Sequence, residues 1–61
     1  MINDKEIIET AYVKELEEEF HELSYMLLGE TKEEYAINRF LKRIKIIRHA
    51  QELALNAIKQ S

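Results

Sequence analysis

The chain has 61 residues, with 12 acidic and 9 basic side chains, no cysteine, no proline and a single glycine. A chain this short forms one domain at most and buries only about 60% of the surface that its unfolded form exposes, so a lone core is marginal. Without cysteine, disulfides and thiolate metal sites are excluded, and self-association is the simplest way to enlarge the core. We therefore expect one domain over residues 1–61.

The first predicted helix spans about residues 4–28. Asn3 and Glu6 have the spacing of an N-terminal capping box. Apolar residues then recur at steps of four and three, which places them on one helix face that we expect to form the core; this stripe contains Ile8, Tyr12, Leu16, Phe20, Leu23 and Leu27. Gly29 is expected to end the helix in a left-handed cap, which glycine adopts without steric cost.

The second predicted helix spans about residues 32–59 and begins with a second capping box, Thr31 to Glu34. Its main apolar stripe contains Ile37, Phe40, Leu41, Ile44, Ile47, Gln51, Ala54, Leu55 and Ile58. A second apolar set lies nearly opposite on the helical wheel: Tyr35, Ile46, Leu53 and Ala57, with Ile7 and Tyr25 as a smaller counterpart on the first helix. A helix that is apolar on two sides is usually buried on two sides.

These patterns predict an all-α fold, an antiparallel two-helix hairpin that dimerises into a four-helix bundle. The predicted dimer or partner interface consists of Tyr25, Tyr35, Ile46, Leu53 and Ala57. The alternative is that these are ordinary scattered apolar residues of a protein surface. Whether the set meets a second copy of the chain or a different protein is left open by the sequence.

The charges divide between the two halves of the chain. Residues 1–30 carry a net charge of −7 and residues 31–61 a net charge of +4. A turn near residue 30 brings residues whose numbers sum to roughly 60 level with each other, so Glu15, Glu17, Glu18 and Glu19 should face Lys42, Arg43, Lys45 and Arg48. Such pairing would favour the antiparallel arrangement of the helices.

Two close pairs of residues could suggest chemistry, but neither predicts a site. Glu18 and His21 have the spacing of a di-iron carboxylate motif, yet they should face solvent, level with Lys42 and Arg43, which would repel a metal ion. His49 and Glu52 form one imidazole–carboxylate pair without a pocket around it. The single glycine excludes a glycine-rich phosphate loop. We expect no catalytic residue, no metal and no cofactor.

Nucleic-acid binding is the alternative function, through Arg39, Lys42, Arg43, Lys45 and Arg48. In size and expected shape, the hairpin resembles the ROP-type plasmid hairpins, which dimerise into four-helix bundles and bind paired RNA loops. That resemblance implies an RNA-binding dimer, but fold analogy alone does not carry function.

The leading hypothesis is a small non-enzymatic interaction module, a regulator, inhibitor or adaptor that docks helix-to-helix on another protein. No apolar stretch of about 18 residues predicts a membrane span, and no secretory signal is visible. The sequence therefore predicts a soluble, cytoplasmic protein that forms a homodimer and does not bind membranes.

Overall fold

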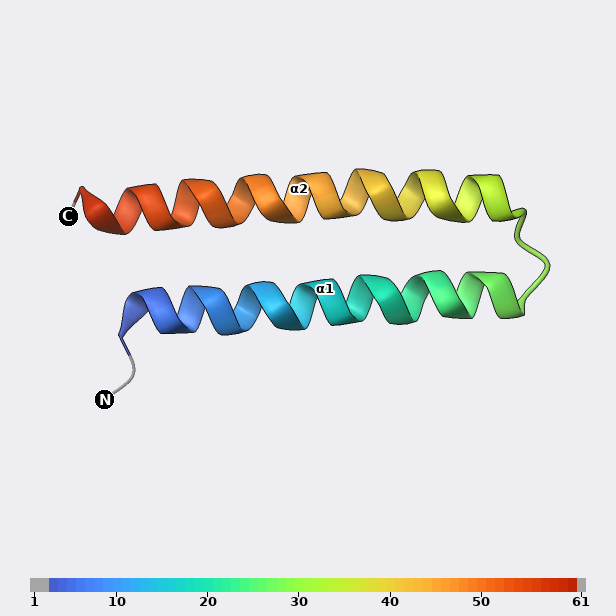
Figure 1. Cartoon of the computed structure of the whole chain (residues 1–61), viewed down its shortest axis with the longest axis horizontal. Coiled ribbons are helices and arrows are strands. Elements are labelled where there is room, and N and C mark those ends of the chain that lie inside the picture. Colours follow the sequence, from blue (N-terminus) through green and yellow to red (C-terminus); the bar gives the residue numbers. More distant parts are fainter. Residues whose placement is uncertain (1–2, 61) are drawn as a thin grey trace.

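The computed structural model describes residues 3–60 and consists of two antiparallel helices joined by a short turn (Figure 1). Helix α1 spans Asp4–Leu28 and helix α2 spans Glu33–Lys59. The predicted all-α hairpin is thereby confirmed, with bounds within one residue of those expected. Residues 1–2 and 61 of the predicted 1–61 domain lie outside the described residues. Neither helix in the described part is long and apolar enough to cross a membrane.

Helix α1 begins as its sequence predicts. The Asn3 side chain accepts a hydrogen bond from the backbone N–H of Glu6 at 2.8 Å. This bond satisfies one of the backbone donors that an α-helix leaves free in its first turn. Asp4 and Glu6 add negative charge at the positive end of the helix dipole.

The turn differs from the prediction at two residues. Gly29 is extended, with φ −81° and ψ −161°, and its N–H donates to the Tyr25 carbonyl at 3.2 Å, so the predicted left-handed cap is wrong. None of the residues from 3 to 60 has a positive φ. The predicted Thr31 cap is also wrong, because α2 begins one residue later with Lys32 at the cap position and no side-chain hydrogen bond there.

Since Gly29 needs no special backbone conformation, Gly29→Ala should raise stability. A β-carbon at this position would lie 3.6 Å from the Met26 carbonyl oxygen and 3.9 Å from that of Tyr25, which are ordinary contacts. Alanine reduces the conformational freedom of the unfolded chain, so we expect a gain of about 0.4–1 kcal/mol. Thermal unfolding at fixed protein concentration measures the change, and a clear loss of stability would contradict the extended conformation of Gly29.

The two helices form a single layer with almost no interior. The Cα atoms occupy 46 × 21 × 7 Å, so the molecule is one helix thick and has two broad faces. Among residues 3–60, only Ala36, Ile47 and Glu19 are buried, all along the line where the helices meet. Half-buried neighbours complete this seam: Ile8, Tyr12, Leu16, Leu23, Phe40, Ile44, Gln51, Ala54, Leu55 and Ile58.

Part of the predicted core stripe is exposed. Phe20 and Leu27 on α1, and Ile37 and Leu41 on α2, lie outside the seam, so their placement in the hairpin core is wrong. Glu19, which was expected to face the basic residues of the second helix, is only 7% exposed and thus takes a place in the seam that no apolar residue fills. The physical reason is that two helices touch along a line, which covers a narrower strip than the apolar stripes provide.

Helical spacing assigns the exposed apolar residues to the two broad faces. In an antiparallel pair, residues displaced from the seam in the same rotational sense lie on the same broad face. We call one the leucine face; its exposed residues are Val13, Phe20, Leu27, Ile37 and Leu41. The other, the groove face, carries Ile7, Tyr25, Tyr35, Ile46, Leu53 and Ala57. No segment within the described residues 3–60 covers either face.

Candidate protein-docking site

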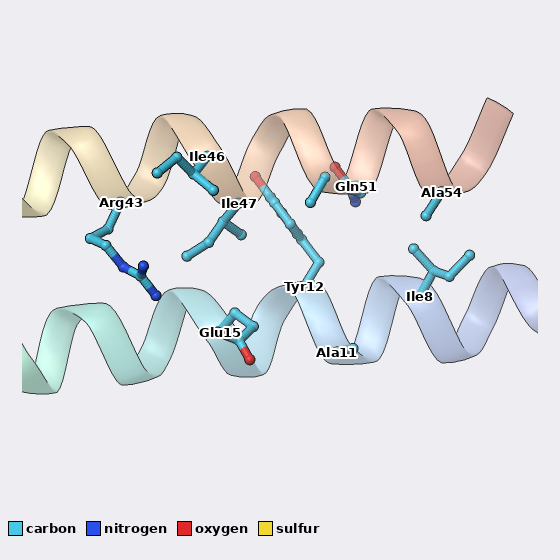
Figure 2. Close-up of a pocket in the computed structure, with 10 residues that line it drawn as sticks. Ile8, Ala11, Tyr12, Glu15, Arg43, Ile46, Ile47, Gln51 and Ala54 are labelled. Carbon is cyan, nitrogen blue, oxygen red and sulfur yellow. The ribbon is translucent and has the colours of Figure 1, made fainter. Parts of the chain in front are cut away.

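A shallow apolar groove of about 400 Å³ crosses the seam on the groove face (Figure 2). Both helices contribute to it, because small side chains stand where larger ones would fill the space. Ala11 on α1 and Ala50 and Ala54 on α2 leave the gap, and Tyr12 lies between the helices. The complete lining is Ile8, Ala11, Tyr12, Glu15, Arg43, Ile46, Ile47, Ala50, Gln51 and Ala54.

The interface residues predicted from the sequence all lie on this same broad face. Ile46 lines the groove, and Leu53 is exposed about two turns further along α2. Tyr25 and Tyr35 flank the turn at level positions and are both well exposed. Ala57 is exposed near the end of α2. The structure thus places the second apolar set on the broad face that carries the groove, but only Ile46 of that set lines the groove itself.

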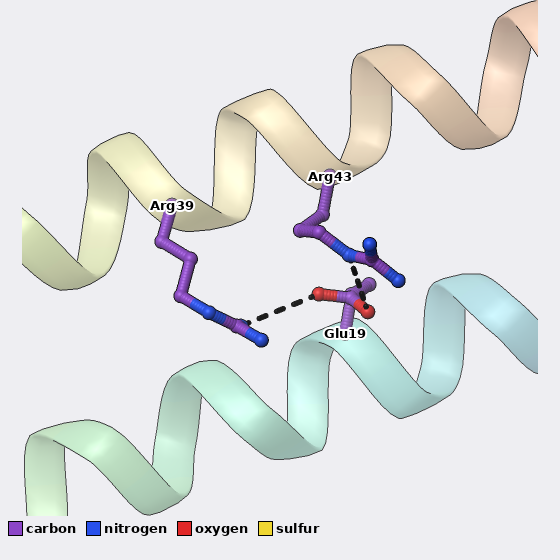
Figure 3. A network of polar contacts seen from close by, with 3 residues as sticks. All are labelled: Glu19, Arg39 and Arg43. Carbon is purple, nitrogen blue, oxygen red and sulfur yellow. Dashed lines mark hydrogen bonds and ion pairs between the residues drawn. The ribbon is translucent and has the colours of Figure 1, made fainter.

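An ion cluster interrupts the seam between the groove and the turn (Figure 3). The Glu19 carboxylate accepts a hydrogen bond from Arg43 Nε at 3.5 Å and forms an ion pair with Arg39 Nη1 at 3.7 Å. Glu19 Oε1 is buried and accepts no hydrogen bond. The arginine side chains are partly exposed, at 39% and 46%. One buried carboxylate is therefore shared by two guanidinium groups that remain partly exposed to solvent.

This cluster confirms one part of the predicted register. Glu19 and Arg43 were expected to lie level, and they are in contact. The only other ion pair found among residues 3–60 is the surface pair Lys5–Glu9 within α1, at 3.8 Å. Among the described residues, the ion pairs between the acidic and the basic helix therefore all involve Glu19, which is the one acidic residue buried in the seam.

The five basic residues of the alternative prediction do not share one side of α2. Arg39 and Arg43 lean toward Glu19. Lys42 and Lys45 are exposed at positions that point away from α1, and Arg48 is on the side of the leucine face. A phosphate backbone that contacted one side of α2 would meet at most part of this set.

The candidate chemical pairs are both at the surface. Glu18, His21, His49 and Glu52 are exposed. The His21 ring packs edge-on against Phe20, with ring centroids 6.1 Å apart. Within the described part of the chain, no three or more His, Cys, Asp or Glu residues gather in a way that could hold a metal ion.

The sequence did not predict the groove, because the groove forms where small alanine side chains leave space between the helices. The spacing of Ala50 and Ala54, one turn apart on the seam side of α2, was the available signal. Its meaning depends on Ala11 lying opposite, which only the register of the two helices reveals. Comparison of the chain with family models, curated proteins and solved structures found no significant match.

Proposed function

We propose that this protein is a non-enzymatic interaction module, a small regulator, inhibitor or adaptor, that docks a helix of another protein on its groove face. The observation that carries the proposal is the apolar groove beside the exposed side chains of Ile46 and Leu53. A concave apolar surface with bulky neighbours suits an amphipathic helix that inserts one or two large apolar side chains. Exposed Tyr25 and Tyr35 add aromatic area of the kind that interfaces favour.

Charge narrows the chemistry of the partner. Arg39 and Arg43 share one carboxylate and are partly exposed, so each guanidinium group keeps N–H donors that can bind an acidic side chain of a docked helix. The bound segment should therefore present a large apolar residue to the groove and an aspartate or glutamate about one to two turns away. The nucleic-acid alternative is less well supported, because the five basic side chains of α2 do not share one side of the helix, and an extended phosphate backbone would meet only part of them.

The test begins with site-specific capture. A photo-crosslinking amino acid at Ile46 should attach to a partner in extracts of the native host, and mass spectrometry then identifies the attached segment. The purified partner is next titrated against the native chain and against Leu53→Glu. We expect the substitution to weaken binding at least about 30-fold, because it places a charge in a desolvated apolar contact.

Leu28→Glu is the matched control. Leu28 is 87% exposed and lies on the side of α1 that is turned away from α2, outside both broad faces. The same chemical change there should leave partner affinity unaltered. Equal losses for the two variants, or a captured segment whose binding is insensitive to Leu53→Glu, would remove the groove face as the docking site.

A further inference from the structure

We propose that the leucine face is the self-association surface of this protein, and that a second copy covers it to form a four-helix bundle whose two turns lie at the same end. This inference goes beyond the proposed function, because it assigns the opposite face of the hairpin and a different partner. It also divides the apolar surface of the chain between two roles: self-association on one face and partner docking on the other.

The hairpin exposes more surface than a compact chain of its mass, and the excess is large enough for a stable homodimer interface. The hairpin exposes 5352 Å² at a mass of 7.3 kDa. A compact folded chain of this mass exposes about 4,200 Å². The excess of about 1,200 Å² per chain, or about 2,400 Å² for a pair, lies in the range of obligate homodimer interfaces.

The direction of the apolar stripes selects the leucine face. On α1, the buried residue Glu19 points toward α2. On α2, the buried residues Ala36 and Ile47 point toward α1. Successive residues are about 100° apart around a helix axis. On each helix, the centre of the main apolar stripe therefore lies about 45° from the direction of the other helix, and on both helices it is rotated toward the leucine face. In a square four-helix bundle the apolar stripe of each helix faces the bundle axis, which is about 45° from the line to either neighbour.

The middle of the leucine face carries a bulky apolar cluster that can pack against its own copy. Phe20 lies level with Leu41, and the half-buried Leu16 lies level with Ile44, close to the midpoints of both helices. A two-fold axis through this region brings the bulky cluster of one copy onto the same cluster of the other, which is the self-complementary contact of an isologous interface. Such large central residues usually dominate binding energy.

Charge decides the orientation of the second copy. If the two-fold axis runs parallel to the helices, α1 of one copy packs on α2 of the other, so the half with net charge −7 meets the half with net charge +4. If the axis runs across the helices, α1 packs on α1 and the two acidic halves face each other. Like charges along a contact are unfavourable, so the first arrangement is preferred. It places both turns at one end of the bundle.

Two variants with the same chemistry test the choice of face. Leu41 and Leu53 are both on α2 and are 57% and 56% exposed, but they lie on opposite broad faces. By sedimentation equilibrium, the native chain and Leu53→Glu should have twice the 7.3 kDa mass of one chain. Leu41→Glu should raise the dimer dissociation constant at least about 100-fold. A dimeric Leu41→Glu, a monomeric Leu53→Glu, or a native monomer at about 50 µM would overturn the proposal.

If Leu41→Glu does not fold, the melting temperatures of the native chain and of Leu53→Glu still test whether the protein is a dimer. The melting temperature of a dimer rises with protein concentration, whereas that of a monomer does not. We therefore expect a concentration-dependent melting temperature for the native chain and for Leu53→Glu. A melting temperature independent of concentration for the native chain would overturn the dimer. The partner titration with Leu53→Glu reports separately on the groove face, so the two proposals fail by different measurements.

The position of the turns tests the orientation. The chain has no cysteine, so Glu30→Cys gives a single labelling site in the turn. Packed helix axes lie about 8–10 Å apart, so spin labels on two turns at the same end should be separated by less than about 25 Å. Turns at opposite ends would be separated by nearly the 46 Å length of the hairpin. The longer distance would overturn the proposed packing of α1 on α2.

Discussion

Replacing Ile47 with alanine should abolish most of the stability of this protein. Ile47 is one of two buried apolar residues in the described chain, and it is 8% exposed. Truncating a buried isoleucine to alanine removes transfer free energy and leaves a cavity, which costs about 2–4 kcal/mol. A chain below about 70 residues rarely has more than about 3–5 kcal/mol of stability from its core. Denaturant unfolding followed by circular dichroism at fixed concentration measures the loss.

Ile46→Ala is the control for this prediction. Ile46 precedes Ile47 on the same helix but is 52% exposed on the groove face, so the identical truncation removes little buried area. We expect a change within about 0.5–1 kcal/mol. If both alanine variants lost equal stability, Ile47 would not be the residue that holds the seam together.

Replacing Glu19 with leucine should stabilise the fold by about 1–2 kcal/mol, since a well-packed apolar residue often contributes more to folding stability than a buried charge at the same position. The Glu19 carboxylate is desolvated, its Oε1 accepts no hydrogen bond, and its contacts to Arg39 and Arg43 are 3.7 Å and 3.5 Å long. Both arginines are exposed enough to be solvated when the carboxylate is removed. Leucine at this position would continue the apolar seam of Ile8 and Tyr12.

The neighbouring substitution Glu18→Leu separates this effect from a general preference for leucine in helices. Glu18 is exposed, so the change should shift stability by no more than about 0.5 kcal/mol. Glu19→Ala should be destabilising, because it removes the carboxylate and leaves a gap in the seam. A destabilised Glu19→Leu would show that the ion cluster contributes more than its desolvation costs.

The helix boundaries could be predicted from local signals in the sequence. The chain has no proline, Asn3 caps α1 through its own side chain, and the one glycine lies immediately after Leu28. These signals act over a few residues, so they do not depend on the tertiary fold. The mechanism at Gly29 was not predictable, because glycine is tolerated in extended as well as left-handed backbone.

The sequence by itself determined two amphipathic helices, the single turn that makes them antiparallel, and the register in which Glu19 lies level with Arg43. The tertiary structure alone decided which residues meet. It placed Glu19 in the seam, turned Phe20 and Leu41 onto a broad face, and opened the groove opposite Ala11. The reason is geometric: an apolar stripe is wider than the line of contact between two helices. A helical wheel gives the stripe, but only packing fixes the line of contact within it.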